Sequence, residues 1–218
     1  TAANNKFPRL VHDGNIDKLG LKVLSREIAA KTKKKWFQYQ KGGDFRKWYG
    51  NLEYVVNWES DGYEIQNFSD EATGRIRSHN YNLDYIFKEG VTWNALSSSN
   101  TSARISIGSL FDNAGSSMFA VKTEDSLALL SLMNSYVVSN LVKIISPTLN
   151  YQPGDISKIP VAYSAIQGIE LAINAKNAIE IAKTDWDSFE TSFDYLSVNI
   201  VAKFKDESLL VNTWNKYS

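Results

Sequence analysis

Residues 33–58 read KKKWFQYQKGGDFRKWYGNLEYVVNW, and this stretch indicates how the first half of the chain folds. Apolar and polar side chains alternate at Trp36 and Tyr39, and again from Glu53 to Trp58, which is the period of a half-buried strand. Gly42-Gly43 lies between the two runs and favours a turn. We therefore predict two short strands joined through a glycine-containing loop.

The rest of the chain changes from strands to helices. Short strands are predicted at 91–93, 103–107 and 118–121, and the Ser/Asn-rich stretch 97–102 is predicted to be an exposed loop. The segment 126–145 is apolar on most sides and predicts one buried helix ending before Pro147. An amphipathic helix is predicted over 163–183, and weaker helical patterns cover 15–30 and 196–214. One side of the 163–183 helix carries Ile166, Ile169, Ile173, Ala178 and Ile181.

This order predicts an α+β fold in which a strand-rich lobe is followed by long helices. We divide the chain into a leading segment at 1–32, a strand-rich domain at 33–161 and a helical segment at 162–218. The chain opens on Thr1 rather than methionine, so we expect it to be part of a longer protein.

Composition excludes several kinds of protein. The 218 residues include no cysteine and two histidines, so neither a disulfide framework nor a structural zinc cluster is expected, and we predict no metal site. No apolar run approaches the ~18 residues that a membrane span needs. A cytoplasmic protein with no membrane partner is the expectation.

Charge is zero overall but unevenly distributed. Residues 1–50 contain 12 Lys and Arg against 4 Asp and Glu, whereas residues 51–100 contain 3 against 8. A concentrated positive segment is typical of a surface that neutralises phosphates. An ordinary solvated turn at Lys31 to Lys35 is the alternative reading of the same charges.

Catalytic signatures are absent. The sequence has no glycine-rich phosphate or dinucleotide loop, no nucleophile elbow, and no histidine beside a nucleophile. The carboxylates at Asp185, Asp187 and Glu190 are read as helix capping rather than catalysis. We therefore expect no catalysis and no cofactor in this chain.

Nucleic-acid contact is the function that the remaining polar residues favour. Lysine and arginine neutralise phosphates, and Lys35, Lys41, Arg46 and Lys47 are the candidates for that role. Gly42 and Gly43 would let the backbone approach the DNA closely. Candidates for reading base edges are side chains in the strand-rich half: Arg75, Arg77, Asn80, Ser97, Ser98 and Arg104.

Each of these residues also has a structural interpretation. The arginines could pair with nearby acids on the surface. Trp36, Trp48 and Tyr49 are more readily explained as core residues than as bases' stacking partners.

Eleven stretches together make the sequence resemble the recognition region of the adenine-specific DNA methyltransferases of BREX phage-exclusion systems, the PglX family. They extend over about residues 1–195. The stretches are TAANNKF (1–7), WF (36–37), KGG (41–43), FRKWYGN (45–51), VVNWE (55–59), GVTW (90–93), FDNAG (111–115), LMNS (132–135), SPTLNY with GDI (146–151, 154–156), and DWDSFETSF (185–193).

This resemblance implies what the rest of such a protein contains. Members carry an N-terminal Rossmann-like domain that binds S-adenosylmethionine and methylates an extruded adenine beside an N-P-P-Y motif. Neither that motif nor the glycine-rich cofactor motif occurs here. The resemblance therefore implies a piece that selects double-stranded DNA sequences and works with the catalytic domain of the same protein. In that reading the strand-rich domain at 33–161 is the DNA target-recognition domain, and the helical segment at 162–218 is a spacer.

Two other functions stay open. The helix with Asn134-Ser135 and the proline after it also resemble type IIG restriction-modification enzymes and type I specificity subunits (TaqI-like specificity domains). Alternatively, the chain could be a protein-interaction module that docks other phage-defence proteins through its basic segment.

Overall fold

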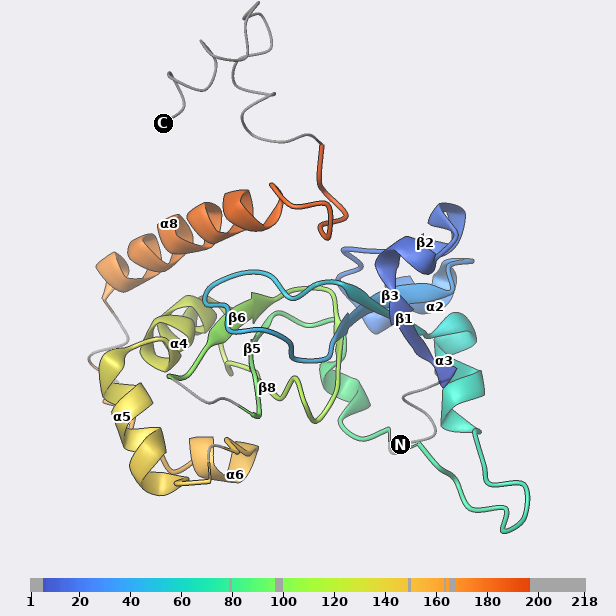
Figure 1. Ribbon diagram of the computed structural model, residues 1–218, viewed down its shortest axis with the longest axis horizontal. Coiled ribbons are helices and arrows are strands. Elements are labelled where there is room, and N and C mark those ends of the chain that lie inside the picture. The colour runs from blue at the N-terminus through green and yellow to red at the C-terminus, as the bar shows by residue number, and fades with distance from the viewer. Residues whose placement is uncertain are drawn as a thin grey trace, which may run out of the picture.

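The computed structural model describes residues 6–78, 80–96, 100–148, 150–162, 164 and 168–196, which form two β-sheets and a group of helices (Figure 1). This arrangement confirms the predicted α+β class. The predicted helix at 196–214 lies outside the described residues, apart from its first residue.

The larger sheet is organised around β3 (Trp36–Gln40). β3 pairs antiparallel with β4 (Tyr54–Asn57), and β4 pairs with β1 (Pro8–Leu10). β2 (Leu19–Gly20) and β7 (Leu110–Phe111) pair parallel with β3. The predicted strand pair is thus confirmed, and the segment before residue 33 contributes β1, β2 and α2 (Arg26–Lys31) to the same unit.

Gly20 explains why the predicted helix at 15–30 is wrong. The chain there forms the short 3-10 helix η2 (Ile16–Lys18), then β2, and becomes α-helical only in α2. A Cβ at Gly20 would lie 2.5 Å from the Phe37 ring, so glycine lets β2 pack closely on β3.

The two faces of this sheet differ in how much apolar surface they bury. One face packs Phe7, Val23, Ala29, Phe37, Val56, Trp58, Ile86, Phe87 and Leu110 into a core beside α2 and α3 (Glu59–Gln66). The other face holds only Val11, Leu19, Trp36 and Val55, next to η1 (Val11–Asp13). Since each buried large side chain contributes about 1.5–3 kcal/mol, the first face supplies most of the hydrophobic stabilisation of the sheet.

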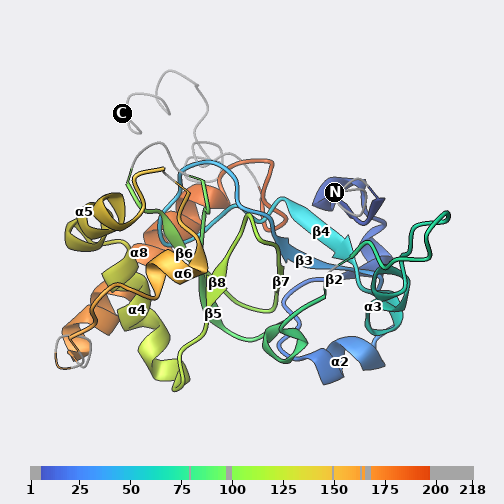
Figure 2. The same cartoon turned by 90° about the horizontal axis from the view of Figure 1, so that it is seen from below.

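The smaller sheet places β5 (Gly90–Trp93) between β6 (Ala103–Ser106) and β8 (Ser117–Met118). The 3-10 helices η3 (Leu83–Tyr85) and η4 (Thr123–Asp125) lie outside this sheet. Among the described residues that follow are the helices α4 (Ser126–Met133), α5 (Tyr136–Ile145), α6 (Pro153–Ile156) and α8 (Ile169–Trp186). α4 contacts both this sheet and α8, as Figures 1 and 2 show. The core here is a second cluster that includes Trp93, Leu130, Val142 and Tyr151.

The loop 41–53 between β3 and β4 joins the two sheets. The Trp48 N–H donates to the Ala103 carbonyl (2.7 Å), and the Ile105 N–H donates to the Trp48 carbonyl (2.9 Å). Trp48 thereby extends the edge of the smaller sheet beside β6. β7 follows β6 in the chain and pairs with β3. The two sheets are therefore connected by a second segment besides the loop 41–53.

Asn134 and Ser135 break the single helix predicted for 126–145. The Asn134 amide pairs with the backbone of Ala103, accepting from its N–H and donating to its carbonyl, each at 2.9 Å. The Ser135 hydroxyl accepts from the Val138 N–H and so starts α5. Among the described residues no single helix is long and apolar enough to cross a membrane, and Thr123–Met133 with Tyr136–Ile145 meets that test only as a pair bent by 74°.

The helix predicted at 163–183 is present from Ile169, but its buried side differs from the prediction. Ala175 and Trp186 are buried, whereas Ile173 and Ile181 are exposed. Ile179, one turn after Ala175, packs against the core of the smaller sheet, so the inner face of α8 combines a small and a large apolar side chain.

Candidate nucleic-acid interface

A groove of about 550 Å³ lies beside the larger sheet, and two of the predicted site residues, Arg77 and Asn80, line its polar side. Its floor is apolar and comes from β3, β4 and β7. Its polar wall includes Arg77, Ser78, Asn80, Tyr81, Asn82, Asp112 and Asn113. Burial, followed by the neighbouring Asp112 carboxylate, raises the pKa of Tyr39 at the floor.

An arm formed by residues 68–78 borders this groove and projects after α3 (Figure 1). Its stem is held by the Ser69–Ile76 bridge and by the Arg77 N–H, which donates to the Phe68 carbonyl (2.8 Å). The Asp70 carboxylate accepts from the Thr73 N–H (2.9 Å) and pairs with the Arg77 guanidinium. The Arg77 hydrogen bond, and then that of Thr73, lower the pKa of Asp70 to about 2. The arm therefore keeps its shape through its own local contacts.

Three predicted base-reading residues come together here. Arg75 is exposed on the arm, while Arg77 and Asn80 line the groove. The exposed Tyr81 beside them was missed from the sequence (72% exposed). The Asp70-Glu71-Ala72-Thr73-Gly74 turn was the available signal, since an Asx turn followed by glycine indicates a projecting tip.

Two side chains that were predicted to contact DNA phosphates, Arg46 and Lys47, instead bind other parts of the chain. The Arg46 guanidinium pairs with the Asp185 carboxylate (2.8 Å) and lies over the Trp186 ring (4.9 Å from its centre). The Lys47 ammonium donates to the Asn134 carbonyl (2.9 Å), and burial lowers the pKa of Lys47. Both side chains attach the loop 41–53 to the helices.

Arg104, a predicted base reader, is fully buried and has no surface for that role in this conformation (0% exposed). Its guanidinium donates to the Arg46 carbonyl (3.1 Å) and to the Asn94 side-chain oxygen (2.8 Å). Burial lowers the pKa of Arg104 to about 10. All four residues of β6 are buried, and Trp48 pairs with the strand at Arg104, so the strand offers Arg104 no solvent-exposed side.

The two ends of β3 hold the remaining predicted lysines. Lys35 pairs with Glu59 (3.2 Å), and Lys41 lies over the Tyr54 ring (4.4 Å from its centre); both are half-exposed. Gly42 has φ +79°, and a Cβ there would lie 2.8 Å from the Ala114 carbonyl oxygen. Gly43, with φ +138°, is exposed beside it. Ser97 and Ser98 lie outside the described residues.

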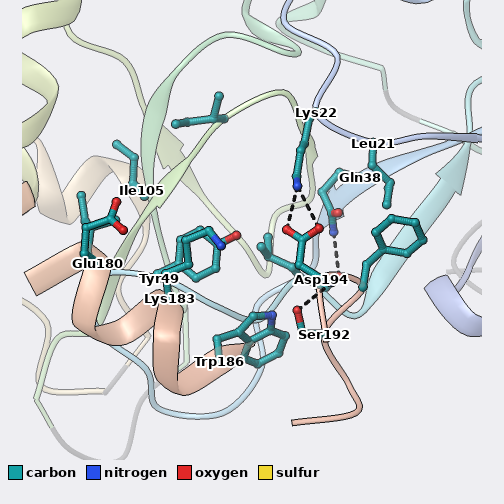
Figure 3. A pocket seen from close by; sticks show the side chains of 14 residues that line it. Leu21, Lys22, Gln38, Tyr49, Ile105, Glu180, Lys183, Trp186, Ser192 and Asp194 are labelled. Atoms are coloured by element: carbon teal, nitrogen blue, oxygen red, sulfur yellow. Dashed lines mark hydrogen bonds and ion pairs between the residues drawn. The ribbon is translucent and has the colours of Figure 1, made fainter. Parts of the chain in front are cut away.

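An apolar pocket of about 370 Å³ separates the end of α8 from the sheets (Figure 3). Leu21, Ile105 and Trp186 line it, and the Lys22–Asp194 ion pair lies at its side (2.7 Å). The pair ties the segment after α8 to the segment after β2. No group of three or more His, Cys, Asp or Glu side chains in the described ranges could hold a metal ion.

The molecule is thus an α+β protein in which a polar groove and a projecting arm collect arginine, asparagine and tyrosine side chains. No protein-family model matches the chain. Two curated relatives are similar to it over most of its length: the adenine-specific methyltransferase PglX of Lacticaseibacillus casei strain Zhang is 40% identical over 197 residues (89% of this chain), and the adenine-specific methyltransferase BrxX of Escherichia coli O9:H4 strain HS is 38% identical over 177 residues (79% of this chain). These matches confirm the expected relation to adenine-specific methyltransferases.

The chain spans about one sixth of the length of these relatives (16% and 14%). It is therefore homologous to one segment of each methyltransferase rather than to the whole protein.

Proposed function

We propose that this chain is the DNA target-recognition region of a BREX-type, S-adenosylmethionine-dependent adenine methyltransferase. The catalytic and cofactor-binding machinery would belong to another domain of the parent protein, with which this region shares the DNA. The observation that carries the proposal is the groove and arm, which gather three predicted base-reading residues within a segment similar to adenine-specific methyltransferases.

The side chains suggest how duplex DNA would be held. Arg75, Arg77 and Asn80 have donors suited to guanine and adenine edges, and residues 71–77 of the arm are all exposed. Lys35 and Lys41, half-exposed at the ends of β3, would contact phosphates. Arg104 leaves the set of proposed contacts because it is fully buried. Arg46 and Lys47 leave the set because they attach the loop 41–53 to Asp185 and to the Asn134 carbonyl.

Fluorescence anisotropy with a mixed pool of labelled duplexes, at low salt and across a salt series, tests the proposal. We expect binding that weakens steeply with salt. Each lost phosphate contact lowers the salt slope by about 0.9, so the Lys35→Ala/Lys41→Ala double variant should lower it by about 2. Lys176→Ala, an exposed lysine on α8, is the matched control and should leave the slope unchanged. Absence of binding at low salt by folded protein would contradict the proposal.

A protein-interaction module is the second candidate, and the outer face of α5 favours it. Tyr136, Val137 and Ile144 are all strongly exposed there, forming an apolar patch on a helix. Under this alternative the wild-type chain would capture another phage-defence protein without binding DNA. Val137→Glu would abolish that capture, whereas Arg75→Ala would not.

A further inference from the structure

The loop 41–53 exposes an unexpected set of residues. Within its first ten positions, only Gly43, Asp44 and Phe45 are exposed, while Arg46 and Lys47 are half-buried. Phe45 leaves about half of its surface in solvent (52%). The tip of this basic segment is therefore an acid and an aromatic ring rather than a cation.

Three side chains hold the backbone on both sides of this tip. The Asn94 side-chain N–H group donates to the Gly43 and Asp44 carbonyls (2.7 and 3.1 Å), and Asn51 donates to the Asp44 carbonyl (2.9 Å). Arg104 donates to the Arg46 carbonyl beyond the tip and also holds Asn94 (2.8 Å).

Burying the Arg104 guanidinium in this hydrogen-bond network costs free energy. A guanidinium that is wholly removed from water costs several kcal/mol before its hydrogen bonds compensate, and the Arg104 Nε has no partner in the described structure. An apolar residue would fill the same space without that penalty. What Arg104 adds is a fixed loop shape, so Asp44 and Phe45 are presented in one orientation.

The chemistry of the tip excludes phosphate as its ligand. The Asp44 carboxylate only accepts hydrogen bonds and is repelled by phosphate, and the neighbouring Arg46 pairs with Asp185. On a base edge, however, a carboxylate accepts from an exocyclic amino group such as that of cytosine, and a phenyl ring contacts the thymine methyl group.

The loop that carries the tip begins next to the groove. Gly42 packs against the Ala114 carbonyl, and Ala114 lines the groove. A duplex held along the groove would consequently extend to the loop.

We propose that Asp44 and Phe45 are specificity-determining contacts to base edges in the major groove of duplex DNA, and that Asn94 and Arg104 are positioning residues for them. This inference rests on the proposed function. It adds two residues that read sequence to the arm and groove.

Selection of duplexes from a library with a randomised core, using the whole chain, tests the inference. Wild type should enrich a motif, and Asp44→Asn and Asp44→Ala should lose about tenfold or more of the preference at one base pair. Phe45→Ala should relax preference at a neighbouring position. The salt slope should stay at the wild-type value in all three, since no phosphate contact is removed.

Matched controls are Glu124→Gln, an exposed acid, and Tyr136→Ala, an exposed ring; both should select the wild-type motif. Asn94→Ala should weaken preference at the same base pair as the Asp44 variants, with retained folding checked by circular dichroism. That pattern would identify Asn94 as acting through the loop.

The outcomes separate the two proposals. If the Asp44 and Phe45 variants select the wild-type motif with wild-type preference, this inference fails and the proposed function stands. If Asp44→Ala only tightens binding to all duplexes equally, Asp44 merely repels the backbone, and the inference fails again. If wild type neither binds at low salt nor enriches a motif, the proposed function fails and this inference fails with it.

Discussion

The loop after β3 and the arm after α3 each carry two closely spaced cations, and the structure uses the two pairs in opposite ways. In the loop, Arg46 and Lys47 bind groups on distant helices, at Asp185 and Asn134. In the arm, Arg77 pairs only with the local Asp70.

The loop lies in the most basic part of the sequence, and the arm lies in an acidic part. Local charge density is therefore a poor guide to which cations can reach a ligand. The distance along the chain to the bonding partner distinguishes the two regions better, because a partner far away makes the cation part of the tertiary structure.

The largest expected effect is at the buried end of the loop network. Arg104→Ala should lower the free energy of unfolding by about 3–5 kcal/mol, because it leaves a cavity and deprives the Arg46 carbonyl and the Asn94 side-chain oxygen of their donor. Urea denaturation measures this value. Arg75→Ala in the arm is the comparison and should stay within about 0.5 kcal/mol of wild type. Equal losses would remove the distinction between the two regions.

A smaller loss of stability is expected at Asn134, which separates α4 from α5 and accepts the Lys47 hydrogen bond. Asn134→Ala removes two buried hydrogen bonds to Ala103 and should lower the free energy of unfolding by about 2 kcal/mol. Asn140→Ala, on α5, should have little effect. If the two variants were equally stable, the Asn134 amide would not be holding the sheet.

Arg46→Ala should have a modest effect, about 1 kcal/mol, because its ion pair is partly solvated and its contact with Trp186 supplies the rest. Binding of duplexes should keep the wild-type salt slope. If Arg46→Ala lowered the salt slope by about 0.9 without a loss of stability, Arg46 would have to be counted among the residues that contact phosphates.

The smallest effect concerns pH. Burial raises the pKa of Glu53, so the Glu53 carboxyl group holds its proton more tightly in the folded chain than in the unfolded chain. Stability from this group is present below its ordinary pKa of about 4.3 and falls as pH rises through the higher folded value. Melting temperatures of wild type and Glu53→Gln, compared from about pH 4 upwards, should therefore shift in favour of the variant as pH rises. A constant difference would show that Glu53 is solvated.

The strands were more predictable than the helices because their pattern depends on nearest neighbours. Alternation around Trp36 and from Glu53 to Trp58 predicted β3 and β4 correctly. The helix break at Asn134 could not be foreseen in the same way, since its cause is the backbone of Ala103, which only the tertiary fold brings close. The buried face of α8 was likewise misread, because the prediction followed the large Ile173 and Ile181, and the packing follows Ala175.

For the candidate site, the sequence predicts which side chains carry suitable donors, but it does not predict which of them are exposed. Arg75, Arg77 and Asn80 were predicted by their donors, and they gather at the groove and arm. Arg104 has the same guanidinium donors as Arg75 and Arg77 but is buried, because Trp48, from a loop distant in sequence, covers the edge of β6 beside it. No local pattern distinguishes these two situations.

The pairing of β3 with β7 has a consequence for how the chain acquires its structure. Each sheet contains partners that are close in sequence, such as β3 with β4 and β5 with β6, and these hairpin-like pairs need little loop closure. Tyr39 and Leu110, by contrast, meet only after the whole intervening chain exists. The junction between the sheets should therefore form last and limit the folding rate. During synthesis, the edge of β3 that pairs with β7 would stay unpaired until β7 has been made. The loop that displays Asp44 and Phe45 would meanwhile lack its supporting contacts.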